Sequence, residues 1–264
     1  MGLGAGRMDA ASFTAVRIVA GAVVLAVLVR AKAGSWQALR GGGRRLGVTG
    51  PLALVAYAAP FSFAYVRIGA AAGALILFGS VQLTMIGWGL ARGERPGART
   101  WLGLGLAAAG LGWLTVPAIS RPDPVGSALM VVAGCAWGVY SLAGKRAPDA
   151  LAANARSFLW ASPLALAIAA ATAATSALKV EARGVALALV SGGITSGVGY
   201  AIWYRALRGL TATEAAILQL AVPVIAALGA VALLNEPLNP RLVVAGLAVI
   251  GGVALALTAR RPSG

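Results

Sequence analysis

The sequence predicts an all-α polytopic membrane protein, and three observations support this fold class. Hydrophobic residues make up 59% of the 264-residue chain, whereas charged residues make up only 11%. Long apolar blocks run from Ser12 to Leu257, separated by short gaps that are rich in Arg and Lys. A helix needs about 20 apolar residues to cross a hydrocarbon core roughly 30 Å thick. No segment shows the alternation of apolar and polar residues over about ten positions that a membrane β-barrel requires.

Nine blocks of the sequence predict spanning helices, because lipid offers no partner to an unpaired backbone group. The blocks are Ser12–Val29, Gly47–Val66, Ile68–Ala91, Thr100–Pro117, Val125–Gly144, Ala152–Ala174, Gly184–Ala206, Thr211–Leu234 and Leu242–Leu257.

The distribution of Lys and Arg over the loops predicts the orientation. One set of alternate loops carries fourteen of these residues and the other set carries six. Because the basic loops stay on the cytoplasmic side, we expect a cytoplasmic C-terminus, an outside N-terminus and a place in a bacterial inner membrane. A signal peptide cleaved near Ala31-Lys32-Ala33 is an alternative for the first block. Arg17 inside that block and the basic loop after it favour a spanning helix.

Composition excludes several function classes. The net charge of +15 would suggest nucleic acid in a soluble protein, but here the basic residues lie in short loops where orientation and anionic lipid account for them. There is no histidine, and Cys135 is the only cysteine, so His-based catalysis, His-containing zinc sites and an internal disulfide are excluded. We therefore expect no enzyme, metal, cofactor or nucleic-acid partner. The expected partners are a small-molecule substrate and membrane lipid, with a monomer or a homodimer both open.

A weak internal repeat appears when the chain is shifted by 142 residues. Ala72–Gly112 then falls on Glu214–Ala254 with five identities, among them Glu94 on Glu236. Both segments consist of a helix, a short turn containing Glu and Pro, and a second helix. The matched helices have opposite predicted orientations, which is typical of the inverted repeats of secondary transporters.

The repeat predicts two inverted halves of a five-helix type, at residues 1–122 and 123–264. The second half has five predicted helices and the first has four. Because Val125–Gly144 has no counterpart, we expect that the first helix of repeat one is missing and that a counterpart precedes Ser12. An inactive truncated chain is one alternative that follows.

Several motifs carry a family resemblance. They are Tyr204-Arg205-Ala206-Leu207, Thr211-Ala212-Thr213-Glu214-Ala215-Ala216-Ile217, Pro223, Asn235-Glu236-Pro237, the glycines Gly246, Gly251 and Gly252, and Ala136-Trp137-Gly138. Together they resemble the EamA type of the drug/metabolite transporter superfamily, over nearly the whole chain. The resemblance implies ten helices in two inverted repeats that export or exchange small metabolites by alternating access. The chain departs from this pattern in lacking the first helix and in carrying Val81 where the second repeat has Pro223. A flippase for lipid-linked substrates, with the same fold, is the alternative function.

Aromatic and amide side chains within the apolar blocks are candidates for the substrate site, because polar groups are costly in lipid. The predicted substrate-binding residues are Tyr57, Gln82, Trp137, Tyr140, Tyr200, Trp203 and Gln219. The aromatic members recur at helical spacing, so that they share faces of three helices. Tyr65 and Tyr204 lie near helix ends and are expected in an interfacial belt instead. The two amides either bind substrate or bridge helices.

Two arginines lie about one turn into their predicted helices. Arg17 and Arg156 either contact an anionic substrate and exchange partners during transport, or snorkel to the headgroups. A cavity with Arg and few carboxylates favours neutral, zwitterionic or anionic solutes over cations.

Three glutamates complete the predicted gating and charge contacts. Glu214 either binds a proton or a cationic substrate, or forms the capping box Thr211-x-x-Glu214 at a helix start. Glu94 and Glu236 end helices at opposite faces of the membrane. We expect these two to be gate or turn residues paired with a nearby Arg.

Overall fold

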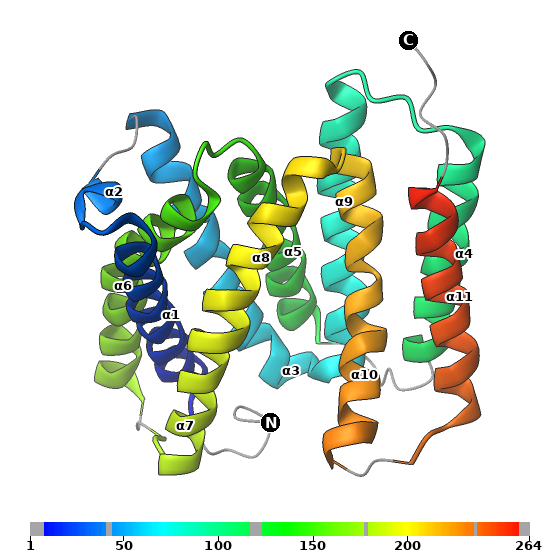
Figure 1. The fold of residues 1–264 in the computed structure, drawn as a ribbon. Coiled ribbons are helices and arrows are strands. Elements are labelled where there is room, and N and C mark those ends of the chain that lie inside the picture. Colours follow the sequence, from blue (N-terminus) through cyan, green and yellow to red (C-terminus); the bar gives the residue numbers. More distant parts are fainter. Residues whose placement is uncertain (1–7, 41–43, 117–122, 177–178, 235–236, 259–264) are drawn as a thin grey trace. The chain divides into compact units, whose positions relative to one another are not determined.

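The computed structural model describes residues 8–40, 44–116, 123–176, 179–234 and 237–258 (Figure 1). All elements within these ranges are helices, apart from an isolated bridge between Met8 and Val180. Seven helices of the described part are long and apolar enough to cross a membrane. The prediction of an all-α multi-pass membrane protein is therefore confirmed, whereas the count of nine spans stays a prediction.

The difference in count arises at two places. The predicted blocks Gly47–Val66 and Ile68–Ala91 both lie in α3 (Arg44–Ala91), which is interrupted at Gly69. Gly69 has φ 71° and ψ −178°, a conformation that essentially only glycine adopts, so α3 consists of two helices. The second place is α4 (Ala98–Thr115), an 18-residue helix that is not among the seven.

The chain forms two compact units. Unit 1 contains Met1–Gly69 and Asp123–Gly209, and unit 2 contains Ala70–Pro122 and Leu210–Gly264. Each unit therefore combines a segment from the first half of the chain with one from the second half.

Unit 1 is built around α1, which packs against α6 and against a π-helical segment, η2. Its elements are α1 (Ala10–Ala33), α2 (Gln37–Arg40), the first part of α3, α5 (Pro124–Lys145), α6 (Ala150–Thr175), α7 (Ala182–Val190), η2 (Ser191–Val198), α8 (Gly199–Ala206) and the 3₁₀ turn η3 (Leu207–Gly209). A Cβ at Gly192 would overlap the carbonyl oxygen of Arg17, and one at Gly21 would lie 2.5 Å from the Phe158 ring. These glycines let α1 approach its neighbours closely, which holds Arg17 inside the unit.

Aspartates begin three helices of unit 1. Asp9 accepts a hydrogen bond from the backbone N–H of Ser12 at 2.8 Å, and Asp149 caps α6 in the same way. Asp123 caps α5 and also accepts a 2.7 Å hydrogen bond from Arg67 Nε. The hydrogen bond from Arg67, followed by the one from the α5 backbone, holds the pKa of Asp123 below its usual value.

Unit 2 consists of the second part of α3 with α4, α9 (Ala212–Gln219), α10 (Ala221–Leu234) and α11 (Pro240–Leu257). Here α4 and α11 lie side by side (Figure 1), and Gly103 faces Gly252 so closely that a Cβ on Gly252 would lie 2.5 Å from the Gly103 carbonyl oxygen. The break between α9 and α10 falls one turn before Pro223, which has no N–H to donate to Gln219.

Candidate functional site

Aromatic side chains from four helices of unit 1 meet in one cluster, which we call the aromatic cluster. Its members are Tyr57, Phe61 and Tyr65 of α3, Trp137 and Tyr140 of α5, Phe158 of α6, and Tyr200 and Tyr204 of α8. The Trp137 ring is central, with its centroid 4.9 Å from that of Tyr57 and 4.7 Å from that of Tyr200. The cluster therefore unites predicted site residues that lie far apart in the sequence.

Buried hydrogen bonds fix one side of the cluster. Tyr204 Oη donates to the Tyr140 carbonyl oxygen at 3.0 Å, and Tyr140 Oη donates to Asn154 Oδ1 of α6. Tyr140 is 0% and Tyr204 is 1% exposed, so the expectation that Tyr204 belongs to an interfacial belt is wrong. Sequence reasoning did not single out Asn154, although an amide within an apolar helix is itself a signal.

Tyr200 and Trp203, the two predicted substrate-binding residues of α8, form hydrogen bonds with neighbouring helices. Trp203 Nε1 donates to Ser141 Oγ of α5 at 3.1 Å, and Tyr200 Oη donates to Tyr57 Oη of α3 at 3.4 Å. These hydrogen bonds place polar atoms among the rings and tie α8 to α3 and α5.

Arg17 of α1 places a positive charge against the aromatic cluster. Its guanidinium carbon lies 5.7 Å from the ring centroid of Tyr57 and 5.9 Å from that of Phe61, at cation–π distance. The residue is only 6% exposed, which does not fit a side chain that snorkels to the headgroups. Within the described ranges, no hydrogen-bond acceptor or carboxylate pairs with this guanidinium. A buried cation without such a partner is unfavourable, so the site is electrostatically suited to an anion.

Arg156 has different surroundings. Its Nη1 donates to the carbonyl oxygen of Ala38 at 3.0 Å, which ties the short helix α2 to α6. The residue is half-buried. A structural contact thus occupies Arg156, and its gating role stays a prediction.

The two predicted amides belong to unit 2. Gln82 Nε2 donates to the carbonyl oxygen of Ala216 at 2.7 Å, and Gln219 Nε2 donates to that of Ala215 at 3.3 Å and to Met85 Sδ at 3.2 Å. Both amides therefore make hydrogen bonds in the described helices, and the Gln82 and Met85 contacts link the second part of α3 to α9. Substrate binding by these amides stays a prediction.

The predicted capping box at the start of α9 is confirmed. The Thr211 N–H donates to Glu214 Oε2 at 2.7 Å, and the Glu214 N–H donates to Thr211 Oγ1 at 3.0 Å. This reciprocal pair commits the Glu214 carboxylate to the helix start.

Glu94, in the turn before α4, completes the same cap. Its Oε1 accepts the Ala212 N–H at 2.7 Å, while Oε2 accepts the Thr213 N–H at 3.0 Å and the Thr213 hydroxyl at 2.8 Å. All four free N–H groups of the first turn of α9 are thereby satisfied. In the described part of the chain Glu94 thus contacts a helix start, where an arginine partner was expected. Glu236 lies outside the described residues.

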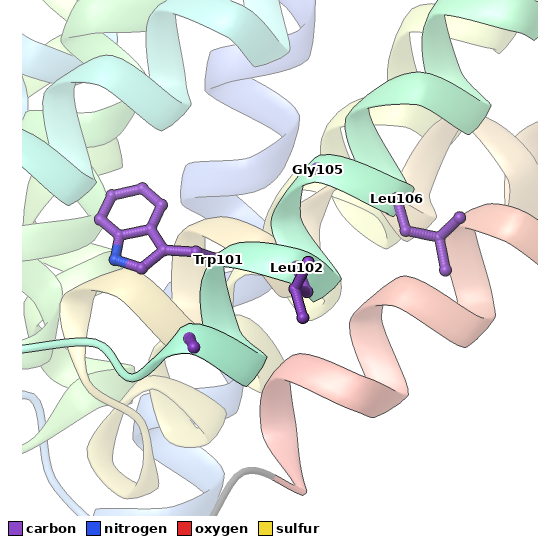
Figure 2. A pocket seen from close by; sticks show the side chains of 5 residues that line it. Trp101, Leu102, Gly105 and Leu106 are labelled. Carbon is purple, nitrogen blue, oxygen red and sulfur yellow. The ribbon is translucent and has the colours of Figure 1, made fainter.

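A shallow hollow on the outer face of α4 is a different kind of surface. Trp101 and Leu102 are adjacent on this helix and Leu106 lies about one turn further along (Figure 2), and the three side chains are 44%, 65% and 43% exposed. The hollow is lined by one helix and is almost wholly apolar. Such a face suits contact with acyl chains, and none of the predicted site residues lies on it.

Comparisons with known proteins identify the family. A profile of the EamA-like transporter family matches residues 124–258. An uncharacterized protein of Pseudomonas aeruginosa is 49% identical over 253 residues, covering 96% of this chain and 86% of that protein. An uncharacterized transporter of Archaeoglobus fulgidus is 27% identical over 202 residues, covering 74% of this chain and 70% of the relative. A crystal structure with 22% sequence identity has the same fold, with a TM-score of 0.79 over 98% of this chain and 91% of its own. The chain belongs to the EamA-like transporter family.

Proposed function

We propose that this protein exports or exchanges small metabolites across a bacterial inner membrane by alternating access, and that its substrate binds at Arg17 and the aromatic cluster. Membership of a transporter family supports the general role. The substrate classes that we propose are amino acids, nucleosides or drugs, among which solutes with a carboxylate fit this site best.

The helix boundaries support two inverted repeats at 1–122 and 123–264. Shifting α4 by 142 residues reproduces the bounds of α11, and shifting α1 ends it at the last residue of α6. The second part of α3 begins, after the same shift, at the first residue of α9. Each compact unit thus contains corresponding pieces of both repeats.

The observation that carries the proposal is the buried guanidinium of Arg17. It lies in a spanning helix against two rings, and the described residues supply no anion for it. A substrate carboxylate would supply that charge, and the rings of Tyr57 and Trp137 would pack against the apolar part of the same molecule. A cationic solute would meet repulsion in the same place.

Counterflow in proteoliposomes tests this function. Amino acids, nucleosides and cationic dyes are offered in turn, and solutes with a carboxylate should exchange. Arg17→Gln should reduce the apparent affinity for them by about 10- to 100-fold, because a hydrogen bond to a charged group contributes about 1.5 to 3 kcal/mol. Arg183→Gln is the matched control, since Arg183 is exposed at the start of α7.

Two results would overturn the proposal. One is equal counterflow by Arg17→Gln and the parent protein, and the other is transport of cationic dyes in preference to carboxylates. Thermal melting of Arg17→Gln, with Arg17→Lys as a charge-retaining partner, separates a binding defect from a folding defect.

A further inference from the structure

A basic pocket lies where the ends of α1, α6 and α8 come together in unit 1. Its volume is about 380 Å³, and it holds Lys32 at the end of α1, Asp149 at the start of α6, Arg205 at the end of α8 and Arg208 in η3. Three cations against one carboxylate leave the pocket positively charged.

The cations of this basic pocket are engaged to different degrees. Lys32 Nζ lies 3.6 Å from Asp149 Oδ2, but the two side chains are 64% and 48% exposed, so this ion pair is weak and exchangeable. Arg208 donates to the carbonyl oxygens of Ala147 and Pro148, which fixes its guanidinium at the rim. Arg205 is exposed and has no hydrogen bond or ion pair with any described residue.

One wall of the basic pocket is apolar. Val198 and Ile202 are 37% and 64% exposed and lie four residues apart, so they form a stripe along η2 and α8 that leads away from Arg205. The pocket therefore joins a cationic rim to an open apolar stripe.

We propose that the basic pocket binds one anionic phospholipid. The phosphate lies among Lys32, Arg205 and Arg208, and an acyl chain lies along Val198 and Ile202. The Lys and Arg count predicts a cytoplasmic location for this end of the helices, where anionic lipids attract basic groups. A soluble phosphate would use the same cations but would leave the apolar stripe without a function.

Native mass spectrometry of the purified full-length chain tests the lipid site. The protein is titrated with short-chain phosphatidylglycerol, with the matching phosphatidylcholine, and with inorganic phosphate as a competitor. Phosphatidylglycerol should bind in preference to phosphatidylcholine. One basic residue beside an anionic lipid contributes about 1 kcal/mol, so Arg205→Gln and Lys32→Gln should each weaken binding about five-fold.

Arg99→Gln is the matched control, because Arg99 is exposed at the start of α4, outside the pocket, in a loop region with the same predicted orientation. It should leave the affinity unchanged. The proposal would be overturned if the two lipids bind equally well, or if Arg99→Gln and Arg205→Gln weaken binding equally. Either result would mean that the lipid is attracted to the basic surface in general and not to this pocket. Displacement of the lipid by inorganic phosphate at a similar concentration would identify a free-phosphate site instead.

Discussion

Replacing Glu94 by alanine should destabilise the protein by removing a cap that comes from another part of the chain. The carboxylate accepts hydrogen bonds from two backbone N–H groups and one hydroxyl at the start of α9. The donor residues Ala212 and Thr213 are only 3% and 2% exposed, so water has little access to them.

The magnitude follows from these contacts. Loss of a helix cap costs about 1 kcal/mol, and a buried donor left unpaired costs about 1 to 3 kcal/mol. Because Glu94 itself is half-buried, water can enter the space that it leaves, which favours the lower part of the range. We expect the free energy of unfolding to fall by about 2 to 3 kcal/mol, with a fall in melting temperature of roughly 2 to 4 °C for each kcal/mol.

Thermal unfolding of the purified protein in detergent is the assay. Glu94→Gln retains one acceptor oxygen and should give an intermediate loss. In Gly89→Ala the new Cβ would overlap the Glu94 carboxylate, so this variant should disturb the same cap without removing the carboxylate. Glu181→Ala is the control, because Glu181 is exposed at the N-cap of α7 and makes no side-chain cap hydrogen bond.

A Glu94→Ala protein that melts within about 1 °C of both the parent and Glu181→Ala would contradict a stabilising role of this cap. A stable Glu94→Ala protein that no longer transports would favour the gate that the sequence predicts for this residue. A Glu94→Ala protein that is less stable but transports at a normal rate per folded molecule would show that Glu94 acts only as a helix cap.

Three other outcomes follow from particular contacts. Gly252→Ala should cost about 1 to 3 kcal/mol in stability, because its Cβ would press on the Gly103 carbonyl, whereas Gly251→Ala, with open space around its Cβ, should not destabilise the protein in the same melting assay. The pKa of Asp123 is lowered from 3.8 on folding, so its stabilisation is present above that pH and is lost as the pH falls through the lowered value. The melting temperature of Asp123→Asn should therefore fall less than that of the parent between about pH 5 and pH 3. Glu214→Gln should keep most of its counterflow activity, with little dependence on an imposed pH gradient, since Gln also serves a capping box; strong acceleration by the gradient that Glu214→Gln abolishes would contradict this.

Local patterns in the sequence were sufficient for many parts of the fold. Apolar blocks predict the helices because lipid excludes other backbone structures. The capping box at Glu214 is also local, since its partner lies three residues away. The contrasting case is Glu94, whose partners lie 118 and 119 residues along the chain. No short-range pattern reveals such a contact, so the sequence suggested an arginine partner instead.

Local sequence patterns also predicted only part of the candidate site. Helical spacing correctly grouped Trp137 with Tyr140, because residues three apart share a face. Spacing does not tell which face of a helix points inward. The position of Tyr204 near a helix end therefore suggested a place at the membrane interface, whereas the residue is buried within unit 1. Asn154 is an amide in an apolar helix, which is a local signal, but its partner Tyr140 lies on another helix and is not revealed by local spacing.

The proposed substrate site and the proposed lipid site each include a cationic residue of α1. Arg17 and Lys32 are 15 residues apart on α1, which corresponds to about 22 Å along the helix. Lys32 is 64% exposed, so water and salt screen its charge over that distance, and direct electrostatic coupling between the two residues should be weak. Arg17→Gln should therefore leave the affinity for phosphatidylglycerol unchanged, and Lys32→Gln should leave the substrate affinity unchanged in vesicles of phosphatidylcholine. Loss of both activities in either variant would mean that the basic pocket acts on transport through α1 itself, and that the two sites work as one.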